Sequence, residues 1–150
     1  MSNNTINRGL QSVKKLIESG DLAGAELTIS KVATLAERSH YQEYNVYFLQ
    51  TGIALKQNKF KDAMNYGLKA IHAKPEEPAA YKVYIQSCKN NNCEKEILNI
   101  IPQILKEAKP VDYIAKLIGP YLNEMEKEEV LDFLNYFKKI ENYQSITEIG

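Results

Sequence analysis

Several residue types that carry chemistry are scarce in this sequence of 150 residues, which has two histidines, two cysteines and no tryptophan. It contains no glycine-rich phosphate loop, no nucleophile elbow and no recognisable pairing of a nucleophile with a base. Acid–base chemistry would therefore rest on carboxylates, and Asp112 and the acidic residues from 124 to 129 are interpreted as solvated helix ends and faces. The sequence predicts no enzyme, no cofactor and no metal site.

The two cysteines, Cys88 and Cys93, are separated by four residues across an expected helix turn. A redox motif has two intervening residues, and a zinc site needs about four ligands, whereas His40 and His72 lie far away in the sequence. A local disulfide is the alternative in an oxidising compartment. The favoured interpretation is two buried or half-buried thiols, which fit a reducing compartment.

Long apolar runs and net charge are missing as well. No run approaches the roughly 18–20 residues needed to span a bilayer, and the first five residues lack the basic and then apolar pattern of a secretory signal. We therefore expect a cytoplasmic protein without a membrane partner. Nineteen basic and nineteen acidic residues cancel, which argues against a nucleic-acid binder, because such proteins usually carry a basic face.

The charges are nevertheless unevenly distributed along the chain. Residues 54–109 hold ten lysines against six acidic residues, a net of +4, and residues 120–150 hold three lysines against seven acidic residues, a net of −4. The acidic end could fold back on the basic middle or meet it in a second copy. Solvated helix faces are the simpler interpretation, and nucleic-acid binding by the basic middle is the weakest one.

Seven glycines and five prolines are few, as expected for a chain that is mostly helical. Gly20 and Asp21 interrupt the first helical pattern, with Asp21 as N-cap, while Asn58 marks a turn, Pro75 a helix end and Pro78 a helix start. No segment shows sustained period-two alternation, so no sheet is expected. The periodicity and turn signals predict helices at 4–18, 22–37, 41–57, 60–73, 78–90, 93–108, 111–125 and 127–140.

A repeated tripeptide suggests that these helices form repeats. Ala-Lys-Pro occurs at 73–75 and again at 108–110, an interval of 35 residues, and a tyrosine follows each copy closely. A fixed interval of this length is typical of helix–turn–helix repeats.

In the segment from Tyr47 to Pro75, Tyr47 is followed by the small residues Thr51 and Gly52, by Phe60 after the turn, and then by Ala63, Ala70 and Pro75. This pattern resembles a tetratricopeptide repeat, with Tyr47 at the early aromatic position and Thr51 or Gly52 at the small one. The resemblance implies one all-α domain over residues 1–150, built from antiparallel helix–turn–helix repeats stacked as a short right-handed α-solenoid of about eight helices. Its units would be at about 5–38, 41–75 and 78–110, followed by divergent C-terminal capping helices at 111–140 and a tail at 141–150.

In this family the first helix of each unit, helix A, lines a concave surface that holds an extended peptide or partner segment. Carried over by position, this predicted helix A groove includes Lys14, Phe48, Leu55, Lys56, Lys82, Gln86 and Lys89, together with Leu10, Ile17 and Gly52. Its four lysines could jointly attract an acidic peptide or a terminal carboxylate, and ordinary surface lysines are the alternative.

The resemblance therefore implies a protein-interaction scaffold or adaptor whose partner is another protein or a peptide. One alternative is a structural or regulatory subunit that forms a homodimer. Another is an N-terminal repeat domain of a larger enzyme such as a glycosyl- or sulfotransferase, where repeats of this family often precede the catalytic part.

Overall fold

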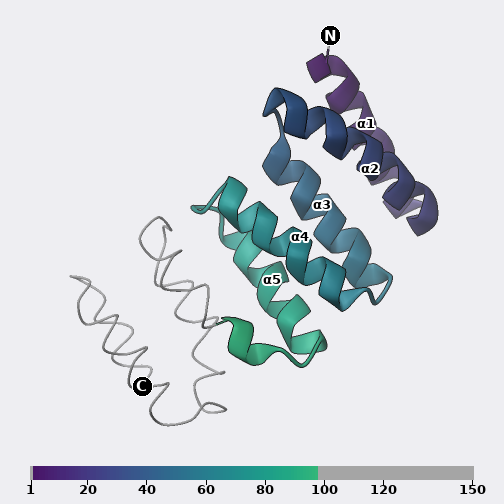
Figure 1. The fold of residues 1–150 in the computed structure, drawn as a ribbon. Coiled ribbons are helices and arrows are strands. Elements are labelled where there is room, and N and C mark those ends of the chain that lie inside the picture. Colours follow the sequence, from purple (N-terminus) through teal and green to yellow (C-terminus); the bar gives the residue numbers. More distant parts are fainter. Residues whose placement is uncertain (1, 98–150) are drawn as a thin grey trace. The chain divides into compact units, whose positions relative to one another are not determined.

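The computed structural model describes residues 2–97, which form helices and turns, with no strand among them. The all-α class is therefore confirmed over this range. The helices predicted at 111–125 and 127–140, the tail, and most of the helix predicted at 93–108 lie outside the described residues, although residues 94–97 are helical. The described helices are α1 (Ser2–Glu18), α2 (Leu22–Ser39), α3 (Glu43–Lys56), α4 (Phe60–Ala73) and α5 (Pro78–Asn90) (Figure 1).

The chain divides into two compact units, Met1–Lys74 and Pro75–Gly150. The first unit contains α1 to α4, and the second contains α5. The division falls at Pro75, the residue at which the second predicted repeat ends. Among the described helices, none has the length and apolar character that crossing a membrane requires.

The turn between α1 and α2 forms as its two signal residues predict. Gly20 has a φ of 84°, in the left-handed region that glycine adopts without a steric penalty. The Asp21 carboxylate accepts a hydrogen bond from the backbone N–H of Gly24 at 2.9 Å and so satisfies one of the unpaired donors at the start of α2. The short connection brings α1 and α2 together as an antiparallel pair (Figure 1).

The turn between α3 and α4 depends on Asn58, whose φ of 60° is also left-handed. Asparagine tolerates this conformation better than most residues, and it lets the N–H of Lys59 reach the carbonyl of Ala54 at 2.8 Å. Helices α3 and α4 pack closely along their lengths, and α2 packs against α3 (Figure 1). The bounds predicted for α4 and α5 agree with those observed.

The start of α3 differs from its prediction. We expected a helix from residue 41, but two residues of the α2–α3 link are left-handed, His40 with a φ of 52° and Gln42 with a φ of 60°. A right-handed helix cannot pass through such residues, so α3 begins at Glu43. Helix α2 continues to Ser39, two residues beyond its predicted end, and His40 closes it by donating its N–H to the carbonyl of Ala36.

The core of the first unit consists of small and branched residues from all four helices. Of the two candidates for the small position in α3, Thr51 is fully buried, and its hydroxyl donates to the carbonyl of Tyr47 at 2.8 Å. A Cβ on Gly52 would meet no atom within 4 Å, so Thr51 is the residue that packs. The buried apolar residues of this unit include Ile6, Val13, Ala25, Ile29, Val32, Ala36, Val46, Ile53, Ala63, Ala70 and Ile71.

Candidate functional site

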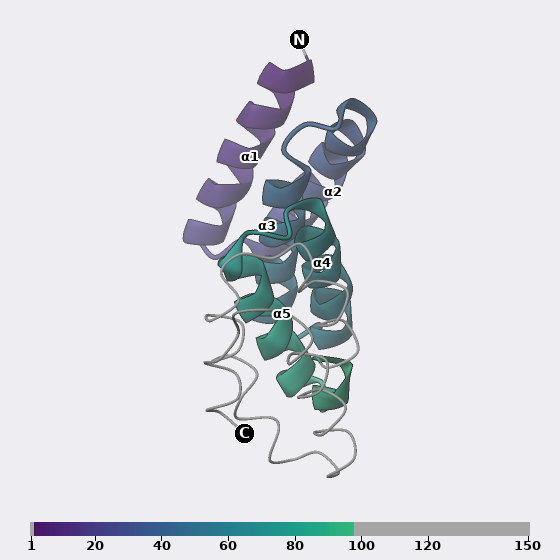
Figure 2. The ribbon, with the colours of Figure 1, turned by 90° about the vertical axis from the view of Figure 1, so that its left-hand side faces the viewer.

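A hollow of about 380 Å³ lies between α1 and the first half of α3, and we call it the α1–α3 hollow. Both helices can be followed in Figure 2. Apolar side chains from both helices (Leu10, Phe48 and Leu49) share its wall with the cation of Lys14 and with four amides. The complete lining is Asn7, Leu10, Gln11, Lys14, Gln42, Asn45, Phe48 and Leu49.

Hydrogen bonds fix one end of this hollow. The hydroxyl of Tyr41 donates to Oδ1 of Asn7 at 3.2 Å, which joins the α2–α3 link to α1. The Asn45 amide donates to the side-chain oxygen of Gln42, whose left-handed backbone places it at the start of α3. Left-handed non-glycine residues carry a conformational cost and are often found at functional sites. The left-handed Gln42 in this wall therefore supports the hollow as a candidate site.

Stacking holds the aromatic side chain of the hollow. Phe48 stacks on Tyr44 with ring centroids 5.8 Å apart and ring planes 17° apart. The ammonium of Lys74, the residue that follows α4, lies 5.8 Å from the centre of the Tyr44 ring. The stacking contact restricts the rotamers of Phe48. The hollow thus presents an apolar ring in one orientation beside polar groups, as binding pockets for small molecules and peptides commonly do.

The residues of the predicted helix A groove do not all gather at this hollow. Leu10, Lys14 and Phe48 line it, whereas Leu55 and Lys56 lie nearer the end of α3, outside the lining. Ile17 and Gly52 are also outside the lining. The remaining three residues, Lys82, Gln86 and Lys89, are exposed on α5 in the second unit.

The sequence analysis missed the amides of the hollow. Asn7, Leu10, Gln11 and Lys14 follow the i, i+3, i+4, i+7 spacing of one helix face, so the α1 side could have been found from this pattern. On the α3 side Phe48 was predicted by position, but Gln42 could not be found, because it precedes the helix and its direction depends on the left-handed link.

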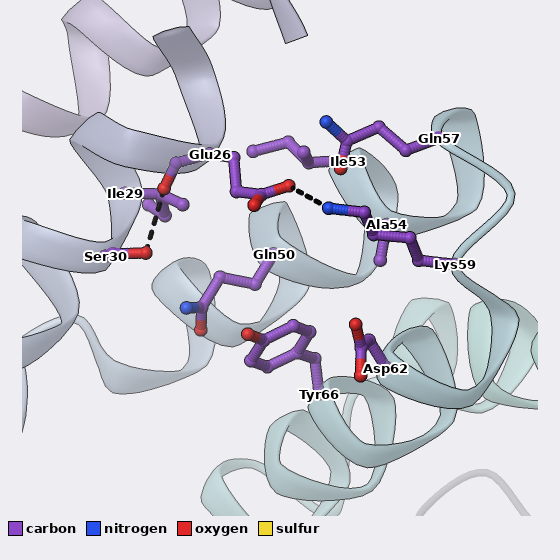
Figure 3. Close-up of a pocket in the computed structure, with 10 residues that line it drawn as sticks. All are labelled: Glu26, Ile29, Ser30, Gln50, Ile53, Ala54, Gln57, Lys59, Asp62 and Tyr66. Atoms are coloured by element: carbon purple, nitrogen blue, oxygen red, sulfur yellow. Dashed lines mark hydrogen bonds and ion pairs between the residues drawn. The ribbon is translucent and has the colours of Figure 1, made fainter. Parts of the chain in front are cut away.

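A second, smaller cavity of about 50 Å³ lies among α2, α3 and α4, all within the first unit, and we call it the α2–α4 pocket (Figure 3). At its rim the ammonium of Lys59 donates to Oε2 of Glu26 at 2.9 Å. This hydrogen bond lowers the pKa of the Glu26 carboxyl and raises the pKa of the Lys59 ammonium. The lining is Glu26, Ile29, Ser30, Gln50, Ile53, Ala54, Gln57, Lys59, Asp62 and Tyr66.

The two cysteines are free thiols, with Cys88 buried and Cys93 half-buried, as predicted. Burial raises the pKa of the Cys88 thiol to about 12, and burial also raises the pKa of the neighbouring Tyr84 hydroxyl. A thiol in this state is a poor nucleophile and a poor metal ligand. Within residues 2–97 there is no cluster of three or more histidine, cysteine or acidic side chains that could hold a metal ion.

Comparisons of this chain with protein-family models, with curated proteins and with solved structures found no match.

Proposed function

We propose that this chain is a protein-interaction scaffold that binds an extended segment of a partner protein in the α1–α3 hollow. The proposal includes a short right-handed α-solenoid of the tetratricopeptide kind in the cytoplasm, with α1 and α3 as the first helices of consecutive units. The observation that carries it is the hollow itself, because it lies between these two helices and contains three residues of the predicted helix A groove. Its volume is that of a peptide or ligand pocket.

The chemistry of the hollow suggests how a peptide would be held. The amides of Asn7, Gln11 and Asn45 each offer both donors and acceptors, which suits the N–H and C=O groups of an extended backbone. Phe48 and Leu10 would cover an apolar side chain of the segment, which is where most of the affinity of such interfaces arises. Lys14 would favour a single carboxylate next to that side chain.

The lining of the hollow changes the charge that we expect of the partner segment, which the sequence analysis based on four groove lysines. Lys14 alone lines the hollow, since Lys56 lies outside it and Lys82 and Lys89 belong to the second unit. We therefore propose a segment with one apolar anchor and one acidic residue in place of a strongly acidic peptide.

Selection of random displayed peptides against the folded chain tests the proposal. Selected peptides should bind wild-type protein and lose about tenfold or more in affinity with Phe48→Ala or Lys14→Glu, because each change removes a group in the wall. Lys56→Glu is the matched control, since it reverses an exposed lysine of the same unit outside the hollow. Peptides that bind all three variants as well as wild type would contradict the proposal.

A further inference from the structure

Helix α5 ends in a turn that brings the two cysteines of the chain together. Asn92 is left-handed, with a φ of 55°. The N–H of Asn92 donates to the carbonyl of Lys89 at 3.1 Å, and the N–H of Cys93 donates to the carbonyl of Cys88 at 2.8 Å. These two hydrogen bonds define a Schellman motif, in which the side chains at the positions of Cys88 and Cys93 frequently contact each other.

The shorter of these hydrogen bonds limits the distance between the two cysteines. Bond lengths place the Cα of Cys93 about 1.5 Å from its nitrogen and the Cα of Cys88 about 2.4 Å from its carbonyl oxygen. Together with the 2.8 Å hydrogen bond, these lengths keep the two Cα atoms within about 6.7 Å of each other. Disulfides join cysteines whose Cα atoms lie roughly 4.4–6.8 Å apart, so the backbone already has a spacing that a disulfide can bridge.

The two thiols differ in exposure, which sets the order in which they react. Cys88 is fully buried, whereas Cys93 is half-buried, so a small reagent reaches Cys93 first. The side-chain amide of Asn91 donates to Sγ of Cys93 at 3.3 Å and holds this sulfur at the turn. Burial raises the pKa of the Cys88 thiol to about 12, and the charge of Cys93 adds to this rise, which indicates that the two thiols are close.

We propose that Cys88 and Cys93 form a redox modification site, at which a small-molecule disulfide oxidises the two thiols to an intrachain disulfide. The Cys93 thiolate attacks one sulfur of the reagent and displaces the first small thiolate, which leaves a mixed disulfide on Cys93. The Cys88 sulfur then attacks Sγ of Cys93 and displaces the second small thiolate, which takes up the Cys88 proton. The chain gives up two electrons and two protons, and the reagent becomes two small thiols.

The length of the closed loop makes this disulfide reversible. The stability that a disulfide adds grows with the length of the loop it closes, and only four residues separate Cys88 from Cys93. Disulfides of cytosolic proteins are usually transient and redox-sensing. The site lies in the second unit and the α1–α3 hollow in the first, so this proposal is independent of the function proposed above.

Equilibration of the full chain with reduced and oxidised glutathione tests the site. The mixtures are quenched by alkylation, digested with trypsin and analysed by mass spectrometry. Trypsin cleaves after Lys89, between the two cysteines, so the intrachain disulfide links two peptides of a chain that has monomeric intact mass. The native chain should favour the disulfide about tenfold or more over the same chain in urea, because the turn holds the thiols together. A native equilibrium constant equal to or below that in urea overturns the proposal.

Single-cysteine variants separate the two steps. With oxidised glutathione alone, wild type should form the mixed disulfide on Cys93 quickly and the intrachain disulfide slowly, because the buried Cys88 thiol stays protonated at neutral pH. Cys88→Ser should stop at the mixed disulfide, and Cys93→Ser should stay reduced. A mixed disulfide that persists in wild type as long as in Cys88→Ser would contradict the proposal.

Two substitutions of Asn92 test whether the turn pairs the thiols. Glycine adopts the left-handed conformation freely, whereas a β-branched residue such as valine is disfavoured there. Asn92→Val should therefore open the turn and lower the native equilibrium constant about tenfold, while Asn92→Gly should leave it within about twofold of wild type. Both variants should match wild type in urea, where the turn is absent. If the two variants have equal constants in buffer, the turn does not pair the thiols and the proposal is wrong.

Discussion

Gly9 and Gly52 both lie inside helices of the first unit, in different surroundings. A Cβ on Gly9 would collide with the Cγ2 methyl of Val32 on α2, whereas a Cβ on Gly52 would meet nothing within 4 Å. We expect Gly9→Ala to lower the free energy of unfolding by about 1–3 kcal/mol, because it overpacks the contact between α1 and α2. Gly52→Ala should raise it by roughly 0.5–1 kcal/mol, since alanine loses less conformational freedom in a helix.

Urea unfolding followed by circular dichroism measures both changes. The two variants control for each other, because each replaces a helical glycine by alanine and so carries the same gain in helix propensity. If Gly9→Ala were as stable as Gly52→Ala, α1 would not pack on Val32 as described.

The two thiols should react at different rates. The thiolate is the nucleophile, and because burial raises the pKa of Cys88 to about 12, this thiol stays protonated and covered at neutral pH. We expect an aromatic disulfide reagent to modify one thiol per native chain quickly, namely Cys93. Cys93→Ser should abolish the fast phase and Cys88→Ser should retain it, as measured by absorbance of the released thiolate. A fast phase of two thiols would contradict the burial of Cys88.

The same pKa shift sets a dependence of stability on pH. The Cys88 thiol has an ordinary value of 9.0, which burial raises in the folded state, so the unfolded chain loses this proton first as the pH rises. The stability linked to Cys88 is therefore fully present below pH 9.0 and is lost as the pH rises toward about 12. Tyr84 acts in the same direction, because burial also raises its pKa.

At the scale of one element, the start of α2 depends on the Asp21 cap. The Asp21 carboxylate accepts the N–H of Gly24 at 2.9 Å, and its negative charge faces the positive end of the helix dipole. Asp21→Ala should lower the free energy of unfolding by about 1 kcal/mol. Asp21→Asn keeps a capping oxygen and should lower the free energy of unfolding much less. Thermal unfolding of the two variants therefore separates the contribution of the capping hydrogen bond from that of the negative charge. Equal losses in both variants would assign the effect to charge alone.

The helices were predictable where short-range chemistry decides their ends. Gly20, Asp21, Asn58 and Pro78 act through their own backbone preferences or side chains, and each gave a turn or a helix start where it was expected. The start of α3 was not predictable, because Gln42 is left-handed without the glycine or asparagine that usually marks this conformation. In the same link the Tyr41 hydroxyl donates to Oδ1 of Asn7 on α1, a contact between distant residues that no local pattern predicts.

The candidate sites were predictable only in part. Phe48 and Lys14 were found from a positional resemblance, which places residues along helices but does not show which helices enclose a cavity. The α2–α4 pocket had no signal in the sequence, because a glutamine such as Gln50 is usually exposed on a helix. Its burial results from α2 and α4 covering α3, which only the tertiary structure reveals.

At the scale of the whole molecule, the chain divides at Pro75 into two compact units, and we predict that the first unit folds alone. Its core draws on all four helices, and Ile6, Ile29, Ile53 and Ile71 are each at most 2% exposed. The fragment Met1–Lys74 should therefore unfold cooperatively on heating, followed by circular dichroism. Ile29→Ala in this fragment should cost about 2–5 kcal/mol. A fragment that is unfolded in buffer would show that the second unit is required.

The same fragment tests where the proposed binding surface ends. The α1–α3 hollow lies wholly within Met1–Lys74, whereas Lys82, Gln86 and Lys89 of the predicted helix A groove do not. Peptides selected on the full chain should therefore bind the folded fragment with the same Kd, measured by isothermal titration calorimetry. A loss of tenfold or more would mean that residues after Lys74 contact the peptide, and the charge reversal Lys82→Glu in the full chain should then reproduce part of that loss.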